Sequence, residues 1–564
     1  MKHKRSLGET LVEEGIITRS QLAQAQEEEK RSGQHLRKVV VRMGLIEEND
    51  LVELLSNKLN VPRIELENYL IDPKIVELIP EALARKYDLM PVFKIGNRLT
   101  CAMVDPWNVF ALDELRMKTN FVIEPAVATE AEIRRALDEH YGVRGSMEEV
   151  IRSIDEEKPG LKDLKEDDLK ELEGIVKEPV VIKLVNLMIF EAVREGASDI
   201  HIEPEEKRLK MRFRVDGMLR EVPSPPKHLQ SALISRIKIL ADLDIAERRI
   251  PQDGRFNIRM EGKEIDVRVS CLPTLYGENV VLRLLDVSGA LLSLTHLGFT
   301  KDVFDRYQQL IQEPYGIILV SGPTGSGKTT TLYSSLDKIN TVEKNIITIE
   351  DPIEYRLTGV RQTQVNVKVN FTFANGLRSI LRQDPNVIMV GEIRDKDTAE
   401  IAIQAALTGH LVFSTLHTND AAGAITRLID MGIEPFLVAS SILGVLAQRL
   451  LRTICKECKE EYKPSAESLK FFGTEMPVAD MRFFKGKGCP KCMETGYKGR
   501  IGIFELMIPD EKIRDLTMKK GTRGEIKKHA HWLGMKTLRE EGVRKIQEGL
   551  TTVEEVLRVS REES

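Results

Sequence analysis

The segment Gly322-Pro323-Thr324-Gly325-Ser326-Gly327-Lys328-Thr329 decides the fold, because it fits the pattern G-x-x-x-x-G-K-[ST] without a mismatch. The apolar run 316–321 before it predicts a buried strand, and Thr330 opens a stretch that predicts a helix. Glycines let backbone N–H groups close around phosphate oxygens, and a helix N-terminus adds the positive end of its dipole. Residues 322–330 are therefore predicted to bind a nucleoside triphosphate, with Lys328 on the β- and γ-phosphates and Thr329 on Mg²⁺. A chance glycine-rich turn is the alternative, and the flanking strand and helix argue against it.

Length and charge narrow the class of protein. A chain of 564 residues suggests three or four domains. Its net charge of −5 argues against a nucleic-acid-binding surface, which is usually basic. Acidic residues interrupt every apolar run among the first thirty residues, so no signal peptide is expected. The apolar stretch 436–447 is shorter than the roughly 20 residues of a bilayer span and predicts a buried helix. We therefore expect a cytoplasmic protein that meets a membrane through its surface or its partners.

The pattern along the chain predicts six regions. Residues 1–141 form a mostly helical α/β module, in which 7–17 and 36–46 resemble each other and are each followed by a polar turn and an amphipathic stretch. Residues 142–175 are a charged linker, and 176–290 alternate as a small α+β domain. Residues 291–450 alternate strand and helix patterns, which predicts a parallel sheet. Residues 451–505 hold paired cysteines, and 506–564 are charged and helical.

Acidic and imidazole side chains follow the predicted strands of the nucleotide region. Glu350 ends one apolar run, Glu392 follows the next, and His417 follows the run 411–416. Ligands of open α/β sheets bind beyond the carboxyl ends of the strands, so these residues are predicted to lie near the phosphates. His410 is a further candidate on the same segment. Solvated strand-end acids and structural histidines are the alternatives.

Two other groups carry candidate chemistry. Arg212, Arg214 and Arg220 form either a solvated basic strand or arginine fingers that reach a neighbouring subunit's γ-phosphate. Cys455, Cys458, Cys489 and Cys492 form two C-x-x-C pairs, a spacing that predicts a structural Cys₄ zinc site, with a redox dithiol as the alternative. Cys101 and Cys271 are isolated and are expected in the cores.

Several segments, together with the phosphate loop, resemble the type II/IV secretion ATPase superfamily. They are the paired cysteines and 197–203 (ASDIHIE), 212–217 (RFRVDG), 244–254 (DIAERRIPQDG), 349–355 (IEDPIEY), 390–395 (VGEIRD) and 407–420 (LTGHLVFSTLHTND). The strongest likeness is to the type IV pilus assembly (extension) ATPases, with the type II secretion ATPases as near siblings. Pilus retraction ATPases resemble the core but lack the long N-terminal extension and the cysteine quartet.

The resemblance implies a fold and roles for residues. It implies a homohexamer with a RecA-like ATPase core, preceded by a PAS-like domain, that binds ATP and Mg²⁺. Glu350 would orient or deprotonate the attacking water, and Glu392 would act at the Mg²⁺ position. Arg212 would be a finger across the subunit interface. For His417, the position at a strand end, independently of the resemblance, predicts that it senses the γ-phosphate or relays hydrolysis to the neighbouring subunit. A second finger falls near Lys227, where a lysine cannot make an arginine's bidentate contact.

The resemblance also implies partners. ATP hydrolysis would drive an inner-membrane platform protein, beside the cytoplasmic-ring proteins of the pilus machine, and so add pilin to a fibre. The alternatives are pseudopilus assembly in type II secretion and, in a different class, DNA translocation. The N-terminal duplication resembles a domain that binds cyclic di-GMP in some relatives, but Glu29 and Lys58 stand where those relatives have glutamine. A docking module is the other interpretation of this region.

Overall fold

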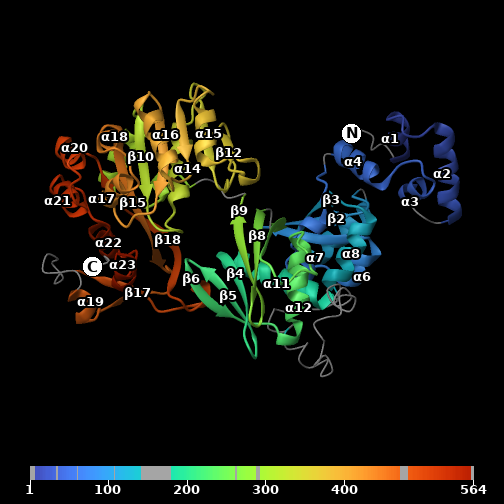
Figure 1. The fold of residues 1–564 in the computed structure, drawn as a ribbon. Coiled ribbons are helices and arrows are strands. Elements are labelled where there is room, and N and C mark those ends of the chain that lie inside the picture. The colour runs from blue at the N-terminus through green and yellow to red at the C-terminus, as the bar shows by residue number, and fades with distance from the viewer. Residues whose placement is uncertain are drawn as a thin grey trace. The chain divides into compact units, whose positions relative to one another are not determined.

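The computed structural model describes residues 7–32, 36–59, 61–106, 108–141, 151, 179–260, 263–287, 292–470 and 481–560. It divides the chain into two compact units, Met1–Ser288 and Gly289–Ser564 (Figure 1). Nearly all of the predicted linker over 142–175 lies outside the described residues. The fold is multidomain α/β, which confirms the predicted class.

The first part of unit 1 contains two helix pairs and a small sheet. The two similar segments of the sequence each form a short helix followed by a longer one: α1 (Leu7–Glu13) with α2 (Arg19–Ser32), and α3 (Leu36–Arg42) with α4 (Glu48–Leu59). The sheet has the order β1-β2-β3. Its elements are β1 (Leu89–Ile95), β2 (Arg98–Met103) and β3 (Val122–Val127), with η1 (Leu66–Asn68), α5 (Pro73–Val76), α6 (Glu81–Lys86), α7 (Val109–Thr119) and α8 (Glu130–Tyr141) around it.

The second part of unit 1 is a six-stranded antiparallel sheet with helices against it (Figure 1). The order is β6-β5-β4-β9-β8-β7, and alternate side chains of β5 are buried, which leaves Arg212 on the less buried face. The elements are α11 (Pro179–Arg194), β4 (Ala197–Pro204), β5 (Leu209–Val215), β6 (Met218–Val222), η2 (Lys227–Leu229), α12 (Gln230–Leu240), β7 (Gln252–Met260), β8 (Lys263–Thr274) and β9 (Gly277–Asp286). Side chains of α11 and α12 share one hydrophobic core with this sheet.

Unit 2 is built on a seven-stranded sheet of order β12-β11-β13-β14-β10-β15-β18, parallel except for β18. The strands are β10 (Gly316–Ser321), β11 (Ile346–Glu350), β12 (Arg361–Gln364), β13 (Val387–Val390), β14 (Leu411–Leu416), β15 (Ile442–Ile454) and β18 (Tyr497–Met507). Side chains that alternate along the strands fill two cores, one on each face. This alternation decides which helix each strand-end residue faces.

Helices cover both faces of this sheet (Figure 1). One core receives side chains from α13 (Lys301–Leu310) and α14 (Lys328–Ile339). The other receives them from α15 (Phe373–Ile380), α16 (Lys396–Leu407), α17 (Ala421–Asp430) and α18 (Pro435–Ser441). The short 3₁₀ helices η3 (Leu294–His296) and η4 (Val367–Val369) lie in the connections.

The prediction of one buried helix over 436–447 is wrong for its second half. Helix α18 ends at Ser441, and Ile442 begins strand β15, which pairs with β10 on one side and β18 on the other. A short apolar run fits a buried strand as well as a buried helix, and here two neighbouring strands decide the outcome. Strand β15 also continues across residue 450 into the cysteine region, and β18 continues across residue 505.

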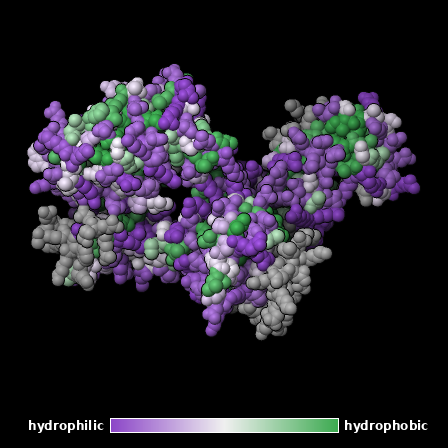
Figure 2. All heavy atoms as spheres, viewed as in Figure 1, coloured by the Kyte–Doolittle hydropathy of each residue, from purple (hydrophilic) through white to green (hydrophobic). Residues whose placement is uncertain are grey.

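The cysteine region and the C-terminal helices complete unit 2. Their elements are β16 (Lys459–Tyr462), α19 (Ala466–Lys470), β17 (Phe483–Gly486), η6 (Pro490–Cys492), α20 (Glu511–Met518), α21 (Arg523–Trp532), α22 (Leu538–Gln547) and α23 (Val553–Ser560). Hydrophilic side chains cover most of the face that Figure 2 shows. Within the described ranges, no helix combines the length and hydropathy that a membrane span requires.

Candidate functional site

The phosphate loop connects β10 to α14 at the carboxyl edge of the sheet. Its glycines at 322, 325 and 327 all have positive φ angles. A Cβ on Gly322 would lie 2.6 Å from the Gln448 carbonyl oxygen, and one on Gly327 would lie 2.8 Å from Gln448 Nε2. The backbone of β15 therefore leaves no room for a side chain at position 322, and at position 327 the φ angle of +88° favours glycine.

Lys328 closes on the loop itself. Its Nζ donates to the carbonyl oxygens of Gly322, at 2.7 Å, and Pro323, at 3.1 Å. Burial lowers the pKa of Lys328 to about 8, although the negative charge of Glu392 acts to raise it. Thr329 is exposed in the first turn of α14, whereas Ser326 is buried and its Oγ has no hydrogen-bond partner among the described residues. Such a buried, unpaired hydroxyl fits a loop built to close around a ligand.

Glu392 and His417 meet beside this lysine. Glu392 follows β13 and pairs with Arg394 at 2.6 Å, and His417 Nε2 lies 3.6 Å from its second carboxylate oxygen. Burial lowers the pKa of His417, and the positive charge of Lys328 lowers it further. The structure thus brings three of the predicted site residues together at one end of the parallel strands.

Glu350 has a different environment. It is 3% exposed, and its carboxylate accepts hydrogen bonds from Tyr333 OH, Thr348 Oγ1 and Gln362 Nε2. Burial raises its pKa. Because these donors occupy both carboxylate oxygens, the geometry favours a positioning role over direct contact with water.

The remaining candidates lie elsewhere. His410 stands at the start of β14, at the opposite edge of the sheet, where its Nδ1 lies 2.9 Å from the Ala405 carbonyl oxygen. Arg212 belongs to unit 1, where it forms an ion pair with Glu203 that raises the Arg212 pKa. Lys227, also in unit 1, donates from Nζ to the Glu205 carbonyl at 2.9 Å.

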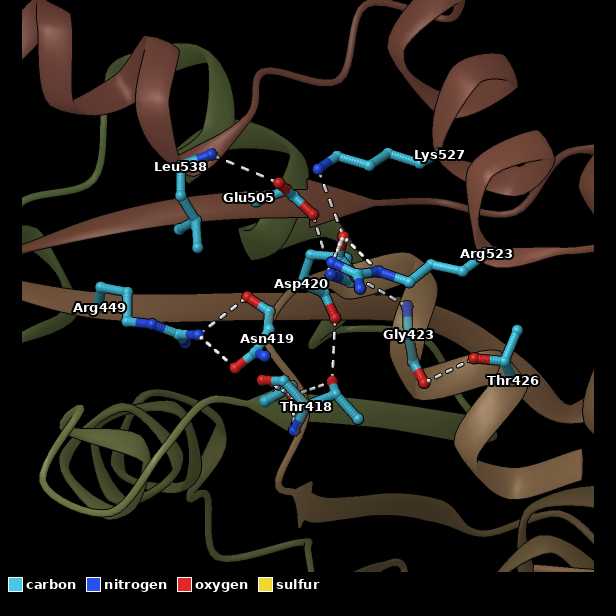
Figure 3. Close-up of polar contacts among 12 residues, drawn as sticks. Thr418, Asn419, Asp420, Gly423, Thr426, Arg449, Glu505, Arg523, Lys527 and Leu538 are labelled. Atoms are coloured by element: carbon cyan, nitrogen blue, oxygen red, sulfur yellow. Dashed lines mark hydrogen bonds and ion pairs between the residues drawn. The ribbon is translucent and has the colours of Figure 1, made fainter. Parts of the chain in front are cut away.

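The sequence patterns did not point to two polar residues of β15, Gln448 and Arg449. Thr331 Oγ1, in the first turn of α14, donates to Gln448 Oε1 at 2.7 Å. Arg449 donates to the Gln448 carbonyl at 3.0 Å. It also donates to the Asn419 carbonyl at 2.9 Å (Figure 3). A polar pair within the apolar run 442–451 was the available signal.

The four paired cysteines converge on one point. Their Sγ atoms lie within 4.8 Å of one another, with separations of 3.7 to 3.9 Å for three of the pairs. A tetrahedral zinc ion with bonds of about 2.3 Å to sulfur separates its ligands by roughly 3.8 Å. Backbone N–H groups of Cys489 and Gly496 donate to Cys492 Sγ, which favours the thiolate. The cluster fits a closed structural metal site.

Two N-terminal residues bear on dinucleotide binding. Glu29 Oε1 accepts the backbone N–H of Leu36 at 2.9 Å, at the start of α3. Arg37 is 7% exposed and donates to the Ala128 carbonyl at 3.4 Å. The carboxylate of Glu29 would repel a phosphate at this position.

Comparison with known proteins places the chain in a family. A family model described as type II/IV secretion system protein matches residues 175–558, and one described as an MshEN domain matches residues 59–147. The chain belongs to the type II/IV secretion system protein family. The superfamily predicted from the motifs is therefore confirmed, and membership shows that the chain is an ATPase.

Individual relatives point to two machines. The chain is 45% identical to the type IV pilus assembly ATPase PilB of Myxococcus xanthus, over 98% of each chain. It is 43% identical to the type II secretion system protein E of Xanthomonas campestris pv. campestris, also over 98% of each. Among solved structures, the Legionella pneumophila ATPase DotB matches with a TM-score of 0.50 at 21% identity, over 67% of this chain and 95% of that one, a likeness of fold.

Proposed function

We propose that this ATPase works as a homohexameric motor that powers type IV pilus assembly. The observation that carries the proposal is the convergence of Lys328, Glu392 and His417 at the phosphate loop, within a chain that matches a pilus assembly ATPase over nearly its whole length. The similar match to a type II secretion ATPase supports pseudopilus assembly as the second candidate. DNA translocation has the least support, given the net charge of −5.

Each residue of the site has a proposed task. Residues 322–330 hold the phosphates of ATP, and on binding Lys328 exchanges two loop carbonyls for phosphate oxygens. The Thr329 hydroxyl would ligate Mg²⁺, which neutralises developing charge in phosphoryl transfer. Glu392 acts at the metal and water side of the site, with His417 against it. Glu350 acts through Tyr333, whose hydroxyl also accepts the Glu354 backbone N–H at 3.3 Å, and so holds the loop after β11 against α14.

Further proposals concern the rest of the chain. Arg212 would reach across a subunit interface to the neighbouring γ-phosphate, exchanging Glu203 for it. The four cysteines would hold structural Zn²⁺. The motor would be cytoplasmic and peripheral to the inner membrane, bound through a platform protein and the cytoplasmic-ring proteins. For residues 1–141 we propose docking, since the contact of Glu29 argues against a cyclic di-GMP phosphate there.

An in-cell experiment tests the pilus assignment. The gene is deleted and complemented with wild type, Lys328→Ala or Lys338→Ala, and surface pili are counted. Lys338 is exposed near the other end of α14, so its variant is the matched control. Pili that return with wild type and Lys338→Ala, but not with Lys328→Ala, support a pilus motor. Normal piliation together with lost protein secretion would transfer the assignment to type II secretion.

A further inference from the structure

Asp420, which caps the N-terminus of α17, also forms ion pairs with two basic side chains, which a helix cap does not require (Figure 3). It is 3% exposed, and its Oδ1 caps α17 by accepting the Gly423 N–H at 2.9 Å. The same carboxylate pairs with Arg523 at 2.9 Å and with Lys527 at 3.4 Å. Both cations come from α21, 103 residues or more along the chain. A neutral asparagine caps a helix as well as aspartate does, so the charge has another purpose.

The segment before Asp420 is bonded to the strand that leads into the phosphate loop. The Thr418 backbone N–H donates to Ser321 Oγ at 3.1 Å, and Thr418 Oγ1 donates to the Asp420 carbonyl at 2.9 Å. Ser321 is the last residue of β10 and directly precedes Gly322. A shift of Asp420 would therefore be transmitted to the start of the loop within two hydrogen bonds.

The same segment is bonded to the other side of the loop. Arg449 Nη2 donates to the Asn419 carbonyl at 2.9 Å (Figure 3). Arg449 Nη1 donates to the Gln448 carbonyl. Gln448 in turn accepts from Thr331, in the first turn of α14. Residues 418–420 thus contact Ser321 before the phosphate loop directly, and Arg449 and Gln448 link them to Thr331 after it. His417, which faces Glu392, directly precedes them.

The residue after Asp420 is bonded to the C-terminal helices as well. Glu505 of β18 is 1% exposed, and its two carboxylate oxygens accept the backbone N–H groups of Ala421, at 2.9 Å, and Leu538, at 3.4 Å. Leu538 is the first residue of α22. The first turns of both α21 and α22 therefore converge on the segment 420–421.

We propose that Arg523 is a positioning residue for ATP hydrolysis. Through Asp420 it fixes residues 417–420 against the phosphate loop, and it thereby couples the C-terminal helices to turnover. Lys527 adds a second, longer contact to the same carboxylate. The proposal rests on the ATPase activity alone, and it stands whether the motor serves a pilus or a secretion system.

The test compares full-length variants with a matched control. Asp420→Asn keeps the helix cap and removes the ion pairs. Arg523→Gln removes the ion pair between Arg523 and Asp420, and Arg523→Lys retains the positive charge. Lys528→Gln removes one positive charge from an exposed position of the same helix. We expect kcat per bound nucleotide to fall about tenfold in Asp420→Asn and Arg523→Gln, because misplaced site residues slow the chemical step. Affinity for a fluorescent ATP analogue should fall by no more than about threefold, far less than kcat. Arg523→Lys should recover part of the loss of kcat, and Lys528→Gln should match wild type.

Two further readouts separate positioning from stability. The double variant Asp420→Asn/Arg523→Gln should be no slower than the slower single variant, because both changes break one coupled unit. Coupling is reciprocal, so a non-hydrolysable ATP analogue with Mg²⁺ should slow amide hydrogen exchange in the first turn of α21. That response should vanish in Arg523→Gln and persist in Lys528→Gln.

Specific results would overturn the proposal. Wild-type kcat per bound nucleotide in both Asp420→Asn and Arg523→Gln would reduce Asp420 to a helix cap. The proposal would also fail if the losses of kcat in the double variant were additive, or if nucleotide did not change amide hydrogen exchange in α21. Either result would show that Asp420 and Arg523 act as independent structural contacts. If Arg523→Gln does not fold, Asp420→Asn and Arg523→Lys decide the question by the same measurements.

Discussion

Glu350 ends strand β11 and Glu392 follows the neighbouring parallel strand β13, but the two acids have opposite surroundings. Glu350 is almost fully buried, accepts three neutral hydrogen bonds and has a raised pKa. Glu392 contacts Arg394 and His417, and its charge acts on Lys328. We therefore expect the two acids to have different roles in the reaction.

Side-chain alternation explains the difference. Glu350 is still part of β11, so it shares a face with Thr348 and points toward α14, where Tyr333 lies in the core. Glu392 comes after β13 has ended at Val390, and the N–H of Gly391 already bonds to the Ile349 carbonyl. A residue at the carboxyl end of a strand lies at the ligand edge of the sheet. Whether its side chain is held on one face of the sheet depends on whether the residue still belongs to the paired strand.

The largest expected effect separates the two acids directly. Glu392→Gln should retain ATP but lower turnover about 100-fold or more, because binding depends on the loop and hydrolysis on the carboxylate. Nucleotide affinity and kcat are measured on the same preparation. Turnover close to wild type would show that Glu392 does not take part in hydrolysis. The proposed difference in role between Glu392 and Glu350 would then be lost.

Glu350→Ala should act mainly through stability. It removes the acceptor of Tyr333 and Gln362, and a buried donor left without a partner costs about 1–3 kcal/mol. We expect a fall in Tm by several degrees and an approximately tenfold loss of turnover through the displaced loop. Glu350→Gln is the control, since it keeps the size and one acceptor. If Glu350→Gln abolished turnover at an unchanged Tm, Glu350 would be the direct base after all.

The contiguous features of the site could be predicted from sequence. The phosphate loop is one segment, and each cysteine pair lies on one turn, so spacing alone shows the chemistry. The strand-end rule also predicted that Glu392 and His417 lie near each other, and their side chains are 3.6 Å apart beyond the ends of β13 and β14. The rule could not show the surroundings of Glu350, because its burial and the donors from α14 and β12 depend on the tertiary fold, which no local pattern contains.

Long-range pairings were beyond the sequence for the same reason. Asp420 and Arg523 are 103 residues apart, and neither lies in a pattern that indicates the other. Gln448 and Arg449 were hidden because residues 436–447 were predicted as one helix, whereas strand β15 begins at Ile442 and continues beside the loop. A helix would have directed these two side chains differently, so the error in local structure concealed part of the site.

The pH dependence of ATP binding offers a finer comparison of the acids. Burial lowers the pKa of Lys328 to about 8, so its ammonium group loses a proton above that pH in the free protein. Phosphates bind the ammonium form, so affinity should be flat below about pH 8 and should fall up to tenfold per unit above it. Glu392 opposes this shift, and Glu392→Gln should therefore move the midpoint to lower pH. Dissociation constants between about pH 6.5 and 9.5 give the midpoint, and an equal shift in Glu350→Gln would contradict the assigned surroundings.

The smallest expected effect on turnover comes from the cysteine cluster. Cys455 follows the end of β15, six residues beyond Arg449, so the cluster anchors the part of the strand that lies past the phosphate loop. Cys458→Ser should release zinc and lower the Tm, while the contact between Gln448 and Thr331 remains and turnover stays within about threefold of wild type. Metal content, Tm and kcat are measured together, and wild type stripped by a chelator and resupplied with zinc is the control. Unchanged metal content and Tm would refute the structural site. A loss of turnover as large as that of Glu350→Ala would show that the far end of β15 also positions the phosphate loop. Indirect positioning would then not be confined to the surroundings of Glu350.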